Sequence, residues 1–349
     1  MNILNKYFGL LLFVILPTFA LKAQLGEKPA IGQMNYRVVF YNLENFFDTK
    51  IDSSKSYNEY TPEGNLHWTD KKYKEKRTHI FQVLTAIAGW EPITLMGFVE
   101  IENAFVLQDL IHHTPLSREN YQIAHFESDD HRGIDVGLIY HADRFKLLTE
   151  QKIQVRNPDD TTFTTRDILY VKGLLAGDTL HVFVNHWVSR WRGMMESEYL
   201  RILCAETLKT VIDSVCTINP DANILVMGDF NDSPDNQSIL KLTEQAGSCP
   251  LLNIPLLPTN KDVKGTLKYG SEWSYFDQFM VSSSLLSAKT NLMLKNKTGN
   301  VFDASFLLEK DEKNLGVKPK RTNIGFKYNG GFSDHLPIFI DIFATSKAK

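Results

Sequence analysis

A short apolar segment that ends in polar side chains constrains the fold of this chain most. The residues from Ile224 to Met227 are all apolar, and Asp229, Asn231 and Asp232 follow within five positions. An uninterrupted apolar run before a glycine predicts a buried strand whose exit carries the polar groups. Because Asp and Asn also favour turns through hydrogen bonds to their own backbone, this stretch alone is equally consistent with an ordinary turn.

The same arrangement recurs along the chain. Strands are predicted over 36–41, 93–99, 180–184, 275–281 and 336–343, and polar groups stand at or beside their ends: Asn42, Glu100, His186, Asp277, Asp334 and His335. Strands that converge at one edge of a sheet would bring these groups into one oxygen-rich pocket with two imidazoles. Such a pocket suits a hard cation such as Mg²⁺. No cysteine or paired histidine has zinc-ligand spacing. Taken alone, His186 is also consistent with a hydrogen-bonded histidine of the core.

The remaining segments predict one α/β domain in which helices flank a sandwich of sheets. Apolar residues at helical spacing predict a helix after a cap at Thr69 and another over 196–215. The pair Ser233 and Pro234 predicts a further helix start, with Gly247 as its end. The polar stretch 291–329 shows little pattern, and we expect a long excursion there.

The N-terminus predicts export. Residues 1–23 contain one early lysine, an apolar core over 10–16 and small residues up to Ala23, which is the layout of a signal peptide. The apolar core is too short to span a bilayer. We therefore expect a periplasmic or secreted protein, with a linker over 24–35, a catalytic domain over 36–345, no transmembrane segment after signal removal, and a monomeric state.

Charge and cysteine content limit the alternatives. The chain has 38 basic and 41 acidic residues, a formal net charge of −3, which argues against a protein that grips nucleic acid with its whole surface. Three cysteines are an odd number, so at least one thiol is unpaired within the chain. Cys204 and Cys216 lie roughly 18 Å apart along the predicted helix and cannot bridge. We expect both to pack as small apolar residues, and the state of Cys249 stays open.

Six short motifs occur in order and carry a family resemblance. They are Tyr-Asn-Leu-Glu-Asn, Val-Glu-Ile-Glu-Asn, Asn-His-Trp, Gly-Asp-Phe-Asn-Asp, Phe-Asp-Gln-Phe and Ser-Asp-His-Leu-Pro-Ile. Together they resemble the endonuclease/exonuclease/phosphatase superfamily, with its deoxyribonuclease I-like fold, over residues 36–343. The resemblance implies a four-layered α/β/β/α sandwich, in which two packed mixed sheets are flanked by helices. It also implies divalent-metal-dependent cleavage of a phosphoester, with Mg²⁺ expected and Mn²⁺ or Ca²⁺ as alternatives.

The resemblance implies a metal site. Glu100 is similar to the principal metal carboxylate, Asn42 to its neighbour, and Asp334 to a residue near the metal. Glu44 and Glu102 could be outer-shell ligands, although a role at the start of a surface helix is equally consistent with their positions.

The resemblance also implies a catalytic set. Asp229 resembles the carboxylate that orients or deprotonates the attacking water, and Asn231 resembles the amide that holds the scissile phosphate. His335 is similar to the histidine on the other side of that phosphate, with Asp277 fixing its tautomer. His186 resembles a second phosphate-facing histidine.

Four further residues are candidates for substrate binding. Arg132, Arg166 and Arg190 lie in loops next to the motif strands, where a guanidinium could meet a substrate phosphate, and Trp187 could stack on a base or sugar. Solvated loop arginines and a tryptophan packed in the core are the alternatives. The basic segment 71–77 is expected to be a solvated helix face.

The sequence therefore predicts an exported phosphodiester hydrolase that resembles a nuclease. Its expected partner is a phosphoester substrate, either nucleic acid or a phospholipid or sugar phosphate. A sphingomyelinase-like or sugar-phosphate phosphoesterase is the alternative. A non-catalytic binding module is disfavoured, since it has no need to keep Glu100, Asp229, Asn231, Asp277 and His335 together.

Overall fold

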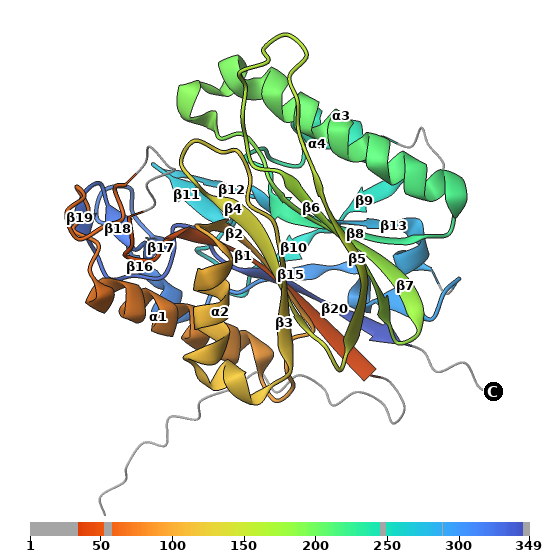
Figure 1. Ribbon diagram of the computed structural model, residues 1–349, viewed down its shortest axis with the longest axis horizontal. Helices are drawn as coiled ribbons and strands as arrows, with labels where there is room; N and C mark the ends of the chain where they lie inside the picture. Colours follow the sequence, from red (N-terminus) through yellow and green to blue (C-terminus); the bar gives the residue numbers. More distant parts are fainter. Residues whose placement is uncertain (1–33, 52–57, 245–248, 288, 345–349) are drawn as a thin grey trace, which may run out of the picture.

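The computed structural model describes residues 34–51, 58–244, 249–287 and 289–344 (Figure 1). The predicted signal peptide and most of the predicted linker lie outside the described residues. The first strand begins at Met34, inside the segment expected as linker, because Met34 pairs with Ala344 of the last strand. Within the described ranges, none of the helices combines the length and the apolar character needed to span a membrane.

Two mixed sheets form the centre of the molecule. The larger sheet has the order β10 (Leu256–Leu257), β15 (Gly299–Val301), β20 (Ile338–Ala344), β1 (Met34–Phe46), β2 (Leu95–Ile101), β4 (Asp135–His141) and β3 (Tyr121–His125), with β14 (Leu292–Leu294) also paired to β20. The second sheet has the order β5 (Phe145–Ile153), β6 (Ile168–Leu175), β7 (Asp178–His186), β8 (Asn223–Asp229), β13 (Asp277–Ser282) and β9 (Leu251–Asn253).

Helices cover the outer face of each sheet. Helices α1 (Asp70–Ala88) and α2 (Ala104–His112) lie on one side of the molecule and α3 (Met194–Ile218) and α4 (Gln237–Thr243) on the other, with the sheets between them (Figure 1). One apolar core fills the space between the sheets and under α1 and α2, and a second lies beneath α3 and α4. The predicted α/β/β/α sandwich is confirmed.

Short helices and hairpins complete the fold. The 3₁₀ helices are η1 (Pro115–Arg118), η2 (Arg190–Arg192), η3 (Ser283–Leu286), η4 (Lys295–Lys297) and η5 (Ser305–Leu307). Three small hairpins pair β11 (Leu267–Tyr269) with β12 (Glu272–Ser274), β16 (Leu308–Lys310) with β17 (Val317–Pro319), and β18 (Asn323–Ile324) with β19 (Lys327–Tyr328). The stretch 291–329 therefore contains short strands that the sequence did not predict, and β16 to β19 form the long excursion expected there outside the two large sheets.

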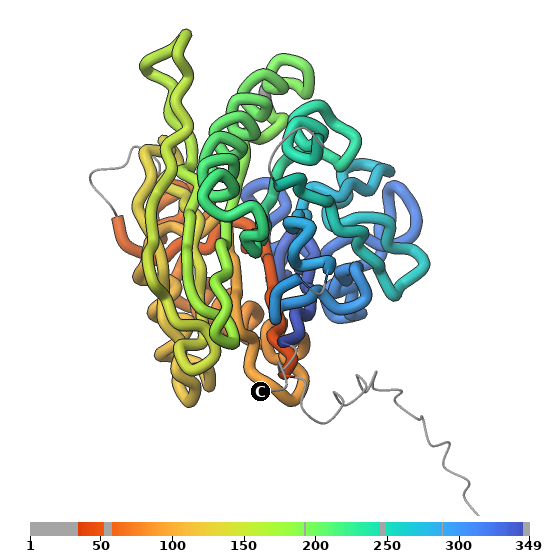
Figure 2. The backbone as a smooth tube through the Cα atoms, turned by 90° about the vertical axis from the view of Figure 1, so that its right-hand side faces the viewer, coloured from red at the N-terminus to blue at the C-terminus, as the bar shows by residue number. Residues whose placement is uncertain are grey.

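Strand direction places the motif residues at one edge. In the larger sheet β1 runs parallel to β2, and in the second sheet β7 runs parallel to β8. The C-terminal ends of the two strands in each pair therefore lie at the same edge of their sheet. β20 is antiparallel to β1 and β13 is antiparallel to β8, so their N-terminal ends reach the same edge. The first and last strands of the described residues, β1 and β20, thus run side by side (Figure 2). β8 lies centrally in its sheet, as predicted.

Two local predictions differ from the structure. Helix α4 begins after Asn236 instead of at Pro234, because the backbone N–H of Asn236 first closes a turn onto the carbonyl of Ser233. The predicted helix end at Gly247 lies outside the described residues. Lys76, expected on a solvated helix face, is fully buried.

The cysteines form one disulfide. Cys216, near the end of α3, is bonded to Cys249, which lies two residues before β9, whereas Cys204 is free and buried. The prediction that Cys204 and Cys216 do not bridge is confirmed, and so is the free thiol. The prediction that Cys216 packs only as an apolar side chain was wrong, because the chain returns to the end of α3 after 33 residues.

Candidate active site

A hydrogen bond between the sheets forms the centre of the site. The Nδ2 of Asn42, on β1, donates to Oδ2 of Asp229, at the end of β8, over 2.9 Å. Both residues are buried. The Oδ1 of Asn42 accepts the backbone N–H of Glu44 at 2.9 Å, which fixes the orientation of the amide. The strand ends of the two sheets are therefore joined by one hydrogen bond between an amide and a carboxylate.

A β-bulge presents Glu100 to this edge. Val99 and Ile101 pair with the consecutive residues Val136 and Asp135, so Glu100 is the extra residue of β2. Its φ of 57° lies in the left-handed region, which non-glycine residues rarely adopt. Bulges re-aim side chains next to functional sites. Here the Oε1 of Glu100 lies 3.9 Å from Nε2 of His186.

A buried histidine lies between two carboxylates on the other side of Asp229. The Nδ1 of His335 lies 2.7 Å from Oδ2 of Asp277, and its Nε2 lies 3.7 Å from Oδ2 of Asp229. An isolated antiparallel β-bridge between the backbones of Leu267 and His335 supports the segment before β20. The three ionisable side chains are close enough to form a metal-binding group. Because His335 is bonded to Asp277, we interpret the group as an oriented imidazole.

The loop after β8 holds the fourth component. Asn231 has a φ of 51°, and its backbone N–H donates to Oδ1 of Asp229 at 3.0 Å. Its Nδ2 donates to the backbone carbonyl of Trp187 at 3.1 Å, which leaves the second N–H of that amide for another acceptor. His186, on the neighbouring strand, lies 3.9 Å from Oδ2 of Asp229.

The pKa values of the two histidines shift in opposite directions. Burial and the nearby Arg166 and Arg132 lower the pKa of His186 well below its ordinary value. Burial also opposes the charge on His335, but Asp277 and Asp229 outweigh it and raise its pKa well above the ordinary value. Burial raises the pKa of Asp229 to about 6, although His335 opposes that shift. A neutral and a charged imidazole thus flank one carboxylate.

A charged network joins the far end of the site to α1. The Oδ2 of Asp334 lies 2.9 Å from Nη2 of Arg321, whose Nε lies 3.0 Å from Oε1 of Glu44. The Nζ of Lys76 donates to the carbonyl of Phe332 at 2.7 Å and also to the hydroxyl of Thr322. Sequence reasoning missed Arg321 and Lys76, since neither lies in a motif. It left Glu44 undecided, and Glu44 is buried beside Asp334.

The structure separates the four substrate-binding candidates. The side chain of Arg132 is 30% exposed and lies near His186. Arg166 is buried against Asp130, and its guanidinium donates to the carbonyl of Trp187. Arg190 donates to the carbonyl of Asn231 at 2.7 Å and pairs with Asp232. Hence Arg132 is the most accessible of the three guanidinium groups.

Trp187 is not placed to stack on a substrate. Its side chain is 1% exposed and packs in the core beneath α3 and α4, edge-on to Phe230. Its indole N–H donates to Oδ1 of Asn185. The substrate-binding prediction for Trp187 was wrong because the residue after His186 turns its side chain into the second core. Its backbone carbonyl is the part that faces Asn231.

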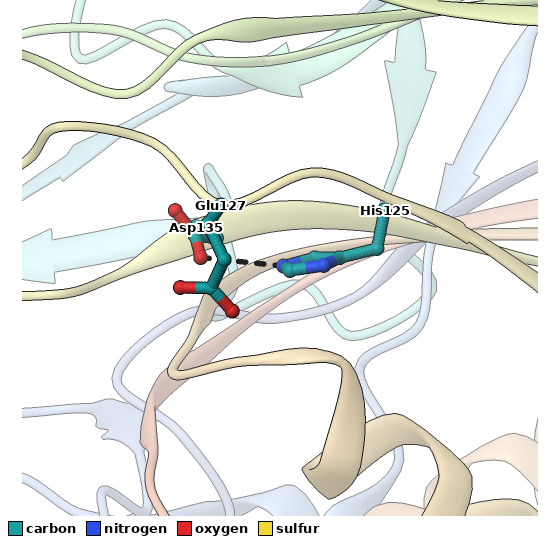
Figure 3. A group of neighbouring side chains, drawn as sticks. All are labelled: His125, Glu127 and Asp135. Atoms are coloured by element: carbon teal, nitrogen blue, oxygen red, sulfur yellow. Dashed lines mark hydrogen bonds and ion pairs between the residues drawn. The ribbon is translucent and has the colours of Figure 1, made fainter. Parts of the chain in front are cut away.

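A second group of metal-type side chains lies at the start of β4 (Figure 3). The Nε2 of His125 lies 3.2 Å from Oδ2 of Asp135, and Glu127 lies next to them. The other oxygen of Asp135 accepts the backbone N–H and the hydroxyl of Ser128. Because one oxygen of Asp135 holds the 126–134 loop through Ser128 and the other is bonded to His125, we interpret this group as a loop anchor.

Comparisons with known structures identify the fold. An endonuclease/exonuclease/phosphatase protein from Bacteroides vulgatus matches with 15% identity and a TM-score of 0.55, over 88% of this chain and 98% of that one. The human Nocturnin catalytic domain with bound sulfate matches with 17% identity and a TM-score of 0.52, over 89% and 95%. A mannosyl-6-phosphatase from Bacteroides thetaiotaomicron matches with 14% identity and a TM-score of 0.55, over 88% and 99%.

No curated protein matches the sequence significantly. The family model described as "Endonuclease/Exonuclease/phosphatase family" matches residues 37–344. That match spans nearly all of the described residues, including every strand end that forms the site. Members of this family hydrolyse phosphoester bonds and depend on divalent metals. The chain belongs to the endonuclease/exonuclease/phosphatase family and is a phosphoester hydrolase.

Proposed function

We propose that this protein is an exported, Mg²⁺-dependent phosphodiester hydrolase that acts on nucleic acid. The observation that carries the proposal is the pair of buried histidines around Asp229, one neutral and one charged. Hydrolysis of a phosphodiester requires a base for the attacking water and positive groups for the charge that develops on the phosphate. Asp229 and His335 meet these two requirements side by side.

Asp229 is the proposed base. Its raised pKa of about 6 lets it accept a proton from water near neutral pH, and Asn42 holds its carboxylate in one orientation. Charged His335, aligned by Asp277, donates to a phosphate oxygen. The remaining N–H of Asn231 and the exposed part of Arg132 supply two further donors, and neutral His186 lies on the opposite side.

Glu100 and Asn42 have the right chemistry for the metal. Among the described residues, no lysine or arginine forms a salt bridge with Glu100, and its carboxylate faces the same edge as the amide oxygen of Asn42. Carboxylate and amide oxygens are the ligands that Mg²⁺ prefers, with Mn²⁺ or Ca²⁺ as alternatives. A cation bound there would act as a Lewis acid on the phosphate.

The disulfide supports export. Disulfides form and persist in oxidising compartments and are rare in the cytosol. The bond between Cys216 and Cys249 therefore agrees with the signal-peptide layout of residues 1–23. A periplasmic or secreted location follows from the proposal.

A substrate panel tests the function. Plasmid DNA, RNA, sphingomyelin, a sugar phosphate and a chromogenic phosphodiester are each incubated with Mg²⁺ or with chelator. We expect metal-dependent cleavage of nucleic acid, and at least a hundredfold loss, about the size of removing one group that stabilises the developing charge, in Glu100→Gln and His335→Ala. Turnover of sphingomyelin or sugar phosphate alone would replace the proposed substrate class. Full activity in both variants would refute the assigned site.

A further inference from the structure

We propose that Arg321, whose side chain is 44% exposed, is a built-in cation that pairs with both Glu44 and Asp334, so that the catalytic edge binds one divalent cation, at Glu100 and Asn42. The inference rests on the proposed metal-dependent function and specifies how many ions that function uses. Three carboxylates lie near this end of the edge: Glu44, Glu100 and Asp334. The charges of all three carboxylates act on the pKa of the buried Lys76, so the three groups lie around the same ammonium group.

The guanidinium of Arg321 spans two of these carboxylates. Its Nε lies 3.0 Å from Oε1 of Glu44 and its Nη2 lies 2.9 Å from Oδ2 of Asp334. The second oxygen of Glu44 accepts the backbone N–H of Thr322 at 2.5 Å. Both oxygens of Glu44 are thus held by the segment that carries Arg321. An arginine fork in this geometry forms stronger hydrogen bonds than an exposed lysine would.

Lys76 fixes the segment that carries Arg321. This side chain is fully buried in α1, and its Nζ is bonded to the carbonyl of Phe332 and the hydroxyl of Thr322. The backbone N–H of Asn329 closes the same segment onto the carbonyl of Thr322. The backbone of this segment is therefore anchored to α1 and closed onto itself, and this fixes the position from which Arg321 reaches the two carboxylates.

Charge balance then leaves Glu100 as the metal carboxylate. Arg321 and Lys76 offset the charges of Glu44 and Asp334 within the protein. In the described part of the chain, the ion-pair contact of Glu100 is instead with an imidazole, that of His186, at 3.9 Å. A second divalent ion between Glu44 and Asp334 would have to displace the guanidinium from a site where it is hydrogen-bonded. Repulsion between like charges opposes that exchange.

Equilibrium metal binding without substrate tests this inference. Mn²⁺ is titrated into the wild-type protein, Arg321→Gln and Arg321→Lys by calorimetry. We expect one ion in the wild type and in Arg321→Lys. Arg321→Gln should bind a second ion, or bind the first about tenfold more tightly, as expected when one positive charge is removed several ångströms from a divalent ion in a hydrated site. Lys289→Gln removes an exposed lysine paired with Asp221 at the opposite edge and should behave as the wild type.

A double variant separates charge balance from direct ligation. Arg321→Gln with Asp334→Asn removes one charge of each sign, so one ion should bind with nearly wild-type affinity. Two ions in the wild type, an unchanged Arg321→Gln, or loss of binding in the double variant would each overturn the inference. Circular dichroism confirms that each variant is folded. Because no substrate is present, failure here is distinct from failure of the nucleic-acid assay, whereas a wild type that binds no ion would remove both proposals.

Discussion

Neighbouring charges add to the effect of burial on the pKa of one histidine at this site and oppose it at the other. His186 and His335 are both buried, yet their pKa values move in opposite directions because arginines face one and carboxylates the other. The motifs contain both histidines but not Arg166, which lies in the loop before β6 and acts on the pKa of His186 from there. Sequence alone could therefore name the titrating groups and could not assign their charges.

We expect Arg132→Gln to impair substrate binding more than the chemical step. The guanidinium is partly exposed and lies near His186, so its loss removes a phosphate contact outside the proposed base. Steady-state kinetics should show KM raised about tenfold with a smaller change in kcat, which is roughly 1.4 kcal/mol of binding. The exposed Arg156→Gln is the matched control. An unchanged KM would contradict this role.

Arg166→Gln should instead lower stability. Arg166 is buried against Asp130, and removing it leaves the buried Asp130 with only the longer ion pair to Arg132, at 3.7 Å. Breaking such a pair typically costs about 3–5 kcal/mol. Urea denaturation of Arg166→Gln beside Arg132→Gln measures the difference, and equal stabilities would show that Arg166 is not structural.

His181 should make stability depend on pH. Burial, followed by the nearby Lys172, lowers its pKa from 6.5 to about 4. Between these values the unfolded chain binds a proton that the folded chain excludes, so this contribution is complete above pH 6.5 and is lost as the pH falls towards 4. Urea denaturation between pH 4.5 and 7 should show a weaker pH dependence for His181→Gln. The exposed His67→Gln should follow the wild type, and an identical profile for both variants would rule out this assignment.

Among the elements, the second sheet needs close backbone contact where β7 and β8 run parallel. An added Cβ at Gly228 would lie 2.5 Å from the carbonyl oxygen of Asn185, which is backbone and cannot move freely. At Gly97 the Cβ would instead meet the flexible end of Met227 at 2.8 Å. The two glycines face different kinds of neighbour, although the sequence shows only a glycine in each strand.

We therefore expect Gly228→Ala to reduce both stability and activity, because it moves Asp229. Gly97→Ala should have the smaller effect, since the end of Met227 can change rotamer. Thermal unfolding and phosphodiesterase assays of the two variants make the comparison. Equal effects of the two substitutions on stability and activity would show that β7 and β8 can move apart at Gly228 without loss of stability.

The disulfide connects α3 to β9 across a loop of 33 residues. Closing a loop of this length restricts the unfolded chain by about 3–4 kcal/mol. We expect reductant, or the paired change Cys216→Ser with Cys249→Ser, to lower the denaturation midpoint. In Cys204→Ala, reductant should lower the denaturation midpoint as much as in the wild type. If it does not, the free thiol of Cys204, and not the disulfide, is responsible for the response to reductant.

At the scale of the molecule, the strand-end pattern was sufficient to predict a sandwich of sheets with a shared edge, and the family resemblance implied the two packed sheets. The pattern sufficed because an apolar run that ends in polar residues is a local property of a segment such as 224–232. It failed for Trp187 and Cys216, whose partners lie on distant elements. It also failed for 291–329, whose short strands are stabilised by pairing with β20 and with one another more than by their own pattern.

The N-terminus gives a prediction for the whole protein. Expressed with residues 1–23 in a bacterium, the chain should be recovered from the periplasm or medium as a mature form starting at Gln24. Mass spectrometry of the intact protein measures the start, and a variant with Leu12→Arg in the apolar core should stay inside the cell. Recovery of full-length wild-type protein from the cytoplasm would contradict the proposed export.

The pairing of β1 with β20 has a consequence for biosynthesis. Asn42 lies in the first strand and His335 just before the last, so the site is complete only after nearly the whole chain has been synthesised and folded. A chain that crosses the membrane before it folds would assemble no active hydrolase on the inner side. Under the proposed export, strand order itself would protect the nucleic acid of the cell that makes the enzyme.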